Sequence, residues 1–265
     1  MTERADIAPT PILGASIPRS GHHHLSRLLK GYFGPELKYC STYDVPDCCR
    51  AAPCARTEGR RFVYQKSHDF AFRLPTDVEG ALYLVQHRTP VANAISGAEL
   101  RRKRSGMRPA SDGLAARLKF YDFLAHRLAY YKRFHDKWIV TPPARCVLIA
   151  HEALESDPAG ELRRIVAATG GRLDDDRLES VAGELKDRGS RRTTYAPRVV
   201  ESSDFFDRGS LAAYEAAVVD QCPAFGYEAT LGGASYRSHP VWWMAKLRHG
   251  FGKRFPPGAG ASEFE

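Results

Sequence analysis

Residues 12–29 read "ILGASIPRSGHHHLSRLL" and combine an apolar run, a short turn and the start of an amphipathic segment. The apolar run at 11–17 has the length of a buried strand, and "PRSG" has the composition of a turn. Apolar residues then recur at helical spacing, at Leu25, Leu28, Leu29 and Phe33. Gly34-Pro35 supplies a stop signal. The stretch therefore predicts a strand, a turn and a helix in succession.

The turn has the features of an anion site. A helix N-terminus presents free backbone N–H groups and the positive end of the helix dipole, which together hold phosphate well. Gly21 lets the backbone approach a ligand, Ser20 supplies a hydroxyl, and Arg19 adds a fixed cation. The turn is not a Walker A loop, because Arg19 stands where the second glycine would be and no Gly-Lys-Ser/Thr follows.

The three consecutive histidines at 22–24 admit three interpretations: a metal site, a tag remnant and the lip of an anion-binding turn. Successive side chains on a helix diverge by about 100°, so the three cannot all face one ion. The run is internal and belongs to an amphipathic helix, which argues against a tag remnant. The anion-binding turn is the favoured interpretation.

Strand and helix patterns alternate along the rest of the chain. Apolar runs predict strands at 61–68, 81–88 and 145–152, and helical patterns begin at 90, 113, 157, 174 and 210. This alternation predicts an α/β fold with a parallel sheet flanked by helices. In such sheets ligands bind beyond the carboxyl ends of the strands, where "PRSGHHH", "KSH" and "HR" all fall. We expect one domain over 1–234, with an irregular cysteine-containing insertion at about 34–60, and a basic, partly loose tail over 235–265.

Composition bounds the class of protein. With 265 residues and 43% hydrophobic residues, the chain can bury a real core. Its net charge of +8 favours an anionic partner. No apolar run reaches the roughly 18 residues of a membrane span, and Glu3 and Asp6 argue against a secretory signal. We therefore expect a cytoplasmic protein with reduced thiols.

Six cysteines occur, and four of them cluster at Cys40, Cys48, Cys49 and Cys54. No pair has the C-x2-C spacing of a zinc knuckle, so loop thiols are favoured over structural zinc, and the role of the cluster stays open. Cys146, in the apolar run "CVLIA", is expected in the core.

The loop "IPRSGHHHLSRLL" resembles the phosphosulfate-binding loop of the sulfotransferase family, whose members use 3′-phosphoadenosine-5′-phosphosulfate (PAPS). Arg19, Ser20, Gly21 and Leu25 match that loop, His22 and His23 replace its hydroxyl pair, and His24 replaces its aromatic residue.

Three further matches follow in the family's order. "QKSH" at 65–68 resembles the Lys-Thr-His segment, through Lys66 and His68. "VQHRTPVANAISGAEL" resembles the 3′-phosphate motif, through Arg88, Pro90 and Ser96. "LIAHEALESD" resembles the Tyr-Glu-Asp-Leu unit through Glu152 and Leu154, with His151 in place of the tyrosine.

The resemblance covers about 11–227 and implies a P-loop-like α/β fold that binds PAPS and releases 3′-phosphoadenosine-5′-phosphate (PAP), with no metal required. It implies that Arg19 and Lys66 stabilise the leaving oxygen, that His68 is the base, and that His22 and His23 contact the phosphosulfate. Arg88 and Ser96 would bind the 3′-phosphate. The family's last motif is not cleanly present. Two pairs compete for its second phosphate contact, Arg191 with Arg192 and Arg208 with Gly209.

The predicted function is sulfuryl transfer to a hydroxyl, or less favourably an amine, of a carbohydrate, lipid or secondary metabolite. The acceptor is a small molecule, glycan or lipid, and the basic loop at 101–112 fits an acidic one. Two alternatives remain: a non-catalytic module that binds PAP, another nucleotide or a polyanion, and a P-loop-like kinase. Nucleic-acid binding rests on charge alone and is not expected. The tail's Trp242-Trp243 either contacts a membrane or packs on the domain, and packing is favoured.

Overall fold

The computed structural model describes residues 9–41, 49, 51–192, 205–232 and 235–248. The chain forms two compact units, each made of separate segments. Unit 1 comprises Met1–Asp69, Arg73–His87 and Pro142–Thr193. Unit 2 comprises Phe70–Phe72, Arg88–Thr141 and Thr194–Glu265. The single domain over 1–234 with a separate tail stays a prediction.

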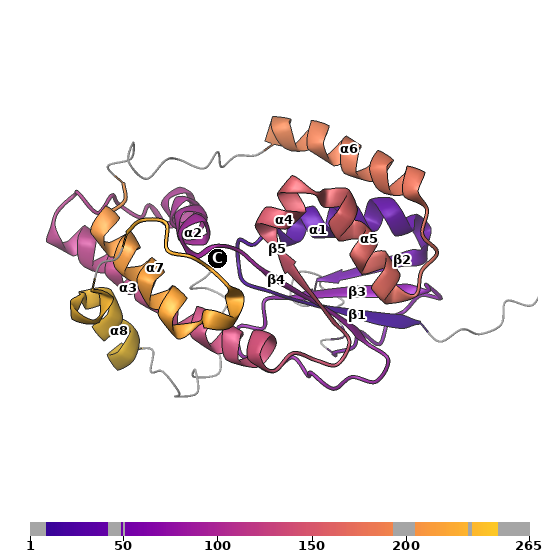
Figure 1. Cartoon of the computed structure of the whole chain (residues 1–265), viewed down its shortest axis with the longest axis horizontal. Coiled ribbons are helices and arrows are strands. Elements are labelled where there is room, and N and C mark those ends of the chain that lie inside the picture. The colour runs from indigo at the N-terminus through magenta and orange to yellow at the C-terminus, as the bar shows by residue number, and fades with distance from the viewer. Residues whose placement is uncertain (1–8, 42–48, 50, 193–204, 233–234, 249–265) are drawn as a thin grey trace, which may run out of the picture. The chain divides into compact units, whose positions relative to one another are not determined.

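Unit 1 contains a parallel five-stranded sheet, in the order β2-β3-β1-β4-β5 (Figure 1). Its strands are β1 (Thr10–Ser16), β2 (Leu37–Ser41), β3 (Phe62–Ser67), β4 (Leu82–His87) and β5 (Cys146–Ala150). β1 lies at the centre, and Gly14 pairs in register with Lys66 on one side and Leu84 on the other. The predicted parallel α/β fold is therefore confirmed, and the strand ends predicted to carry the site meet at one edge of the sheet.

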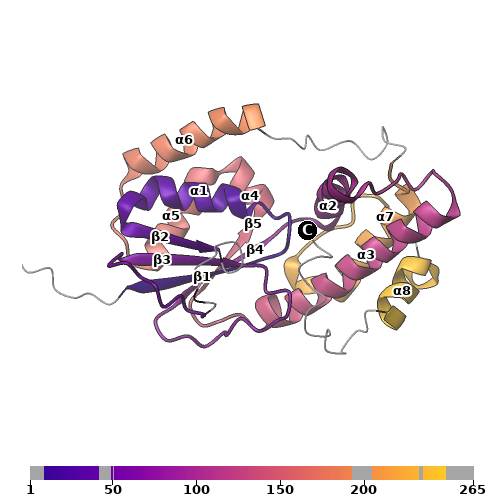
Figure 2. The same cartoon turned by 180° about the vertical axis from the view of Figure 1, so that it is seen from behind.

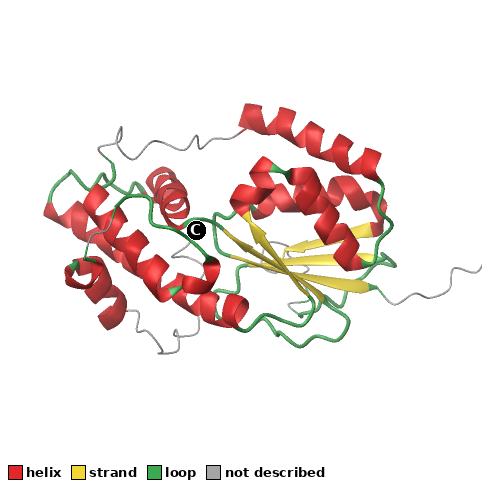
Figure 3. Cartoon of the chain, viewed as in Figure 1, coloured by secondary structure: helices red, strands yellow, loops and turns green. Residues whose placement is uncertain are grey.

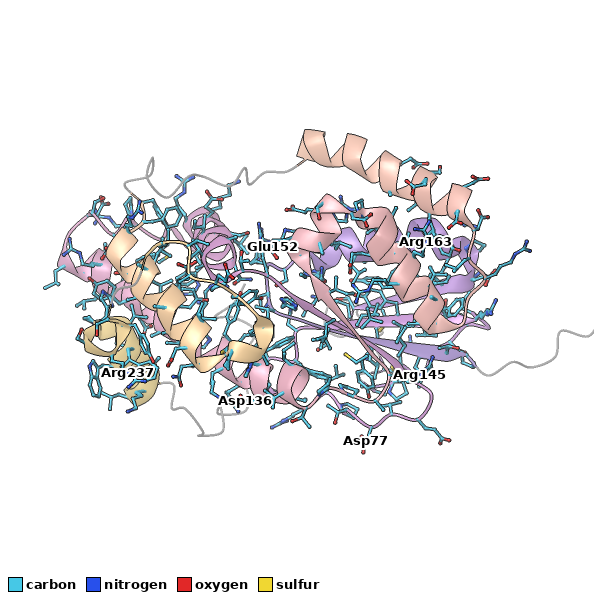
Figure 4. The ribbon with its side chains drawn as sticks, in the orientation of Figure 1. Asp77, Asp136, Arg145, Glu152, Arg163 and Arg237 are labelled. Carbon is cyan, nitrogen blue, oxygen red and sulfur yellow. The ribbon has the colours of Figure 1, made fainter. Side chains whose placement is uncertain are left out.

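Helices cover one face of this sheet, as Figures 1 and 2 both show. They are α1 (His22–Phe33), α4 (His151–Ser156), α5 (Pro158–Thr169) and, packed outside α1 and α5, α6 (Asp175–Arg192). Asp157 caps α5 by accepting from the Gly160 N–H at 2.8 Å, as the "DPAG" signal predicts. Arg163, labelled in Figure 4, ties α5 to Asp175 of α6 at 2.8 Å.

The core of unit 1 lies between these helices and the sheet. The strands contribute Ile12, Leu84 and Ile149, all essentially without solvent exposure. The helices contribute the predicted leucine stripe of α1 together with Leu162, Ile165 and Val166 of α5. Burying each such side chain stabilises the fold by about 1.5–3 kcal/mol. The buried leucines of α1 therefore hold the start of this helix against the end of β1.

The predicted irregular insertion at 34–60 is wrong in its first part. A short 3-10 helix, η1 (Gly34–Glu36), leads directly into the edge strand β2. β2 pairs with β3 in parallel, with Cys40 opposite Gln65. Only Cys40 of its five residues is fully buried. The strand therefore lacks the apolar pattern by which sequence reasoning recognises a strand.

Unit 2 is helical among its described residues (Figure 3). Its elements are α2 (Pro90–Ser105), α3 (Leu114–Phe134), the π-helix η2 (His135–Val140), α7 (Arg208–Gln221), the 3-10 turns η4 (Pro223–Phe225) and η5 (Tyr236–Ser238), and α8 (Pro240–Arg248). α3 packs against both α7 and α8. Within the described ranges, no helix combines the length and apolar content needed to cross a membrane.

The N-terminal end of α3 is partly exposed, since Leu114 is 72% and Leu118 42% exposed, and the buried face of the helix starts at Ala116 and Phe120. The first part of the tail predicted to be partly loose contains α8, which ends in an ion pair between Arg248 and Asp122 of α3, at 2.8 Å. Residues 249–265 lie outside the described part of the chain.

Candidate active site

The turn between β1 and α1 has the geometry expected of the anion-binding loop. The Ile17 N–H donates to the Gln86 carbonyl at 3.0 Å, and the Ser20 N–H donates back to the Ile17 carbonyl at 3.1 Å. Arg19 and Gly21 adopt the left-handed conformation, with φ of 72° and 81°. The chain then enters α1, where the N–H groups of His24 and Leu25 donate to the Gly21 carbonyl at 2.9 and 3.1 Å, whereas those of His22 and His23 precede the first carbonyl that the helix could offer them. The turn is thus a helix N-terminus open to an anion.

Gly21 is required for two separate reasons. Its positive φ is one that other residues adopt only with strain. In addition, a Cβ at this position would lie 2.5 Å from Nδ1 of His151 and 3.5 Å from Nε2 of Gln86. The side chains of His151 and Gln86 therefore pack directly against the loop at Gly21.

The residues of unit 1 predicted for catalysis and phosphosulfate binding gather around this loop. The ring of His22 lies 3.9 Å from that of His23, and 4.8 Å edge-on from that of His68. Burial lowers the pKa of His22 most, and the nearby His68, Lys66, His23 and Arg19 lower it further. So many positive or protonatable groups in one place make the site electropositive and suited to a multivalent anion.

His68 is held in a defined orientation by β1. Its Nδ1 lies 2.8 Å from the backbone carbonyl oxygen of Ser16 and 3.0 Å from the Ser16 hydroxyl. A carbonyl oxygen can only accept, so Nδ1 carries the hydrogen and Nε2 of the neutral ring keeps its lone pair. Burial, followed by the charge of Lys66, lowers the pKa of His68 to about 3. The imidazole is therefore neutral at pH 7, and its Nε2 can accept a proton.

Three buried polar side chains at the loop have atoms without a hydrogen-bond partner among the described residues. These atoms are Oγ of Ser20, both amide atoms of Gln86 and Nδ1 of His151. The opposite nitrogen of His151 lies 3.2 Å from Glu155. Leaving such a group unsatisfied costs about 1–3 kcal/mol, and native structures contain few of them. A ligand or water at the loop would remove that cost.

Sequence reasoning missed Gln86 and gave His151 no role. A signal for Gln86 exists in the sequence: it is the first polar residue after the apolar run "ALYLV" of a buried strand. Glu152, labelled in Figure 4, follows His151 on α4, and its negative charge raises the pKa of His87 against the larger, opposite effect of burial.

Among the described residues, no group of three His, Cys, Asp or Glu side chains is arranged to hold a metal ion.

The residues predicted to bind the 3′-phosphate belong to unit 2. Arg88 lies just before α2, and its carbonyl accepts hydrogen bonds from the hydroxyls of Tyr131 and Tyr227, each at 2.8 Å. Ser96 is buried within α2. These contacts fix the backbone that carries the Arg88 guanidinium.

The two candidate pairs for the second phosphate contact differ in what can be described. Arg208 starts α7, where Asp207 accepts from the N–H groups of Gly209 and Ser210. The Gly209 N–H is therefore already bonded, and the Arg208 side chain is the remaining phosphate donor of that pair. Arg191 and Arg192 end α6, and their side chains lie outside the described part of the chain.

Comparison with known proteins agrees with this architecture. The model of the "Sulfotransferase family" matches residues 78–175. Mouse sulfotransferase SULT7A1, solved in complex with PAP, is 20% identical over 72% of this chain and 70% of its own, with a TM-score of 0.54. The sulfotransferase of Alicyclobacillus acidocaldarius is 17% identical over 87% of this chain and 100% of its own, with a TM-score of 0.47. The sulfotransferase domain of the Synechococcus PCC 7002 olefin synthase is 14% identical over 86% of this chain and 98% of its own, with a TM-score of 0.46. No curated protein sequence matches this chain.

The likeness to the mouse enzyme shows a sulfotransferase fold. The family match covers 98 of the 265 residues and agrees with the resemblance seen in the four motifs. The matched residues include Arg88, Ser96 and Glu152, whereas the first loop, Lys66 and His68 lie before them.

Proposed function

We propose that this protein transfers the sulfuryl group of PAPS to a hydroxyl of a carbohydrate, lipid or secondary metabolite, with an amine as the less favoured acceptor. The observation that carries the proposal is the neutral, oriented imidazole of His68 beside the cationic loop at the start of α1. Sulfuryl transfer resembles phosphoryl transfer: it needs in-line positioning, cations near the leaving oxygen and a base for the acceptor proton.

The loop supplies the groups that a phosphosulfate needs. The N–H groups at the start of α1 and the side chains of Arg19, His22 and His23 would donate to its oxygens. The hydroxyl of Ser20 is buried without a hydrogen-bond partner among the described residues, so an anion oxygen at the loop would satisfy it. PAP in the structure of the mouse neighbour supports a nucleotide of this kind as the ligand.

His68 would act as the general base through Nε2. In the ligand-free protein its pKa is too low for an efficient base, because burial and Lys66 disfavour the charged ring. An anion bound at the loop offsets those positive charges and raises the pKa toward its ordinary value. The base would therefore reach a useful proton affinity only when the donor is bound.

Lys66 and Arg19 would stabilise charge on the leaving oxygen. Lys66 lies at the end of β3, in register with Gly14 of β1. The guanidinium of Arg19 is a permanent cation that cannot donate a proton at neutral pH, so Lys66 is the one of the two that can. We assign the 3′-phosphate to Arg88 and Ser96, helped by the Arg208 side chain or by Arg191 with Arg192.

An acidic acceptor fits a pocket within unit 2. The pocket, about 380 Å³ in volume, is lined among others by Arg101, Lys119 and the apolar Met107, and by Arg108, which pairs with Asp112 at 3.0 Å. Its three cations outnumber the two lining carboxylates, Asp112 and Asp122, which favours a carboxylated, sulfated or phosphorylated molecule, and Met107 favours a partly apolar one.

Peripheral contact with an anionic membrane is a separate proposal for α8. Its Trp243 and Leu247 are exposed, and Lys246 and Arg248 lie on the same short helix. Exposed apolar side chains flanked by cations suit the headgroup region of a bilayer.

Thermal stabilisation by PAP, measured against ADP and AMP, tests the proposed function. A ligand at 100 times its dissociation constant adds about 2.7 kcal/mol of stability. We expect PAP to stabilise the protein more than ADP or AMP, and Arg88→Ala to abolish the preference for PAP. Equal responses to PAP and ADP would contradict the proposal and favour a kinase-like site. PAP binding without sulfate transfer to any acceptor in a panel of sugars, sterols and phenols would favour a non-catalytic module.

A further inference from the structure

Two cysteine sulfurs touch in the segment between β2 and β3. Sγ of Cys49 lies 3.6 Å from Sγ of Cys54. Cys54 is 7% exposed and packs with Cys40 and Val63, whereas Cys49 is partly exposed at the edge of this cluster. The pair therefore combines one sulfur that solvent can reach with one buried sulfur in contact with it.

The surroundings of Cys49 favour its thiolate. The N–H groups of Ala51 and Ala55 donate to its sulfur and lower the pKa of the thiol to about 7. The thiolate, which is the nucleophilic form, is therefore more populated at neutral pH than in an ordinary cysteine. Burial has the opposite effect on two other cysteines: it raises the pKa of Cys146 to about 11 and that of Cys222 to about 12.

A disulfide between the two sulfurs requires only a small movement. A disulfide bond is about 2.05 Å long, so the sulfurs must approach by roughly 1.5 Å. We propose that Cys49 and Cys54 form a reversible disulfide that peroxide generates and that controls the neighbouring anion site.

The proposed chemistry proceeds in two balanced steps. The Cys49 thiolate attacks one oxygen of hydrogen peroxide, which gives a sulfenic acid and hydroxide. The Cys54 sulfur then attacks the sulfenic sulfur, so that the S–S bond forms and the hydroxyl leaves as water with the Cys54 proton. A dithiol reductant reverses the reaction by thiol–disulfide exchange.

One hydrogen bond connects the pair to the candidate active site. Nε2 of Gln65 donates to the carbonyl of Ala51 at 2.7 Å, within the six-residue loop that the disulfide would close. Gln65 directly precedes Lys66 at the end of β3. Closing the loop would thus act on the strand end that carries Lys66. This regulatory part rests on the proposed function, whereas formation of the disulfide does not.

Trypsin provides a direct test of the disulfide. Cleavage after Lys38, Arg50 and Arg56 places Cys49 in peptide 39–50 and Cys54 in peptide 51–56. We expect hydrogen peroxide to link the two peptides, tandem mass spectrometry to locate the bond at Cys49 and Cys54, and dithiothreitol to release them. Cys49→Ser should abolish the link, and the controls Cys48→Ser and Cys222→Ser should retain it. Absence of a link, or a link that persists in Cys49→Ser through Cys40 or Cys48, would overturn the proposal.

PAP affinity tests the regulatory part. We expect the dissociation constants of the oxidised and reduced protein to differ by about fivefold or more, as expected of coupled sites. The Cys49→Ser variant should show one value under both conditions. A linked pair with unchanged PAP affinity would overturn the regulatory claim. A reduced protein that does not bind PAP would contradict the proposed function instead, and the peptide link would still decide the disulfide.

Discussion

Nδ1 of His68 lies 2.8 Å from the backbone carbonyl oxygen of Ser16. This contact joins the end of β3 to the end of β1, two neighbouring strands of the sheet. It fixes which nitrogen of the imidazole carries the hydrogen, and it leaves Nε2 as the acceptor. The sheet itself thus sets the orientation and the tautomer that a general base requires.

His68→Asn separates the orientation of this side chain from its basicity. The asparagine amide can donate to the Ser16 carbonyl as Nδ1 does, but it has no group equivalent to Nε2. We expect kcat for sulfate transfer to fall by about 10²–10⁴-fold, with little change in PAP affinity. His239→Asn, a histidine of unit 2 near Tyr121, is the matched control and should retain activity. Full activity in His68→Asn would exclude His68 as the base.

Folding stability should fall as the pH drops below about 6.5. Burial lowers the pKa of His87 to about 4 and that of His68 to about 3, from an ordinary value of 6.5. The unfolded chain therefore binds more protons than the folded one over this interval, so stability rises with pH there. His87→Gln should give a smaller slope of unfolding free energy against pH between 6.5 and 4. Urea titrations of both proteins at several pH values measure it, and identical slopes would refute the assignment.

PAP binding should be accompanied by proton uptake. In the ligand-free protein, burial lowers the pKa values of both His22 and His68, and the nearby charges of Lys66 and Arg19 lower them further. A bound anion raises these pKa values, so protons are taken up near neutral pH and affinity increases as the pH falls. Calorimetry in buffers of different ionisation enthalpy measures the number of protons. His22→Asn should reduce that number; no uptake in the wild type would mean that these histidines do not contact the anion.

The sequence predicted those parts of the molecule that local patterns determine. The central strands, α1 and the capped helix α5 appear where their apolar spacing and end signals place them. β2 escaped notice because an edge strand with one fully buried residue has no such pattern. Gln86 and His151 could not be recognised as neighbours of Gly21, since β4, α4 and the loop meet only through the parallel pairing of the sheet.

Gly21→Ala should damage the loop more than a glycine substitution elsewhere in unit 1. A Cβ would meet Nδ1 of His151 at 2.5 Å in addition to the strain of a positive φ. Gly80→Ala is the matched control, because Gly80 has φ of 69° and no atom within 4 Å of the added Cβ. We expect Gly80→Ala to lower the free energy of unfolding by only about 1–2 kcal/mol, the cost of placing alanine in the left-handed conformation. Gly21→Ala should lose more stability and most of its PAP affinity, and equal effects would show that His151 does not restrict the loop.

Gln86→Leu should affect stability and ligand binding in opposite directions. Gln86 is 1% exposed, and neither amide atom has a hydrogen-bond partner among the described residues. An apolar side chain of similar size removes that unsatisfied group, so the ligand-free variant should be at least as stable as the wild type. If the amide bonds to the loop or to a water when the donor binds, PAP affinity should fall by about tenfold, which corresponds to about 1.4 kcal/mol. Melting curves with and without PAP measure both effects. A variant that melts lower in both states would mean that the amide serves the fold rather than the ligand.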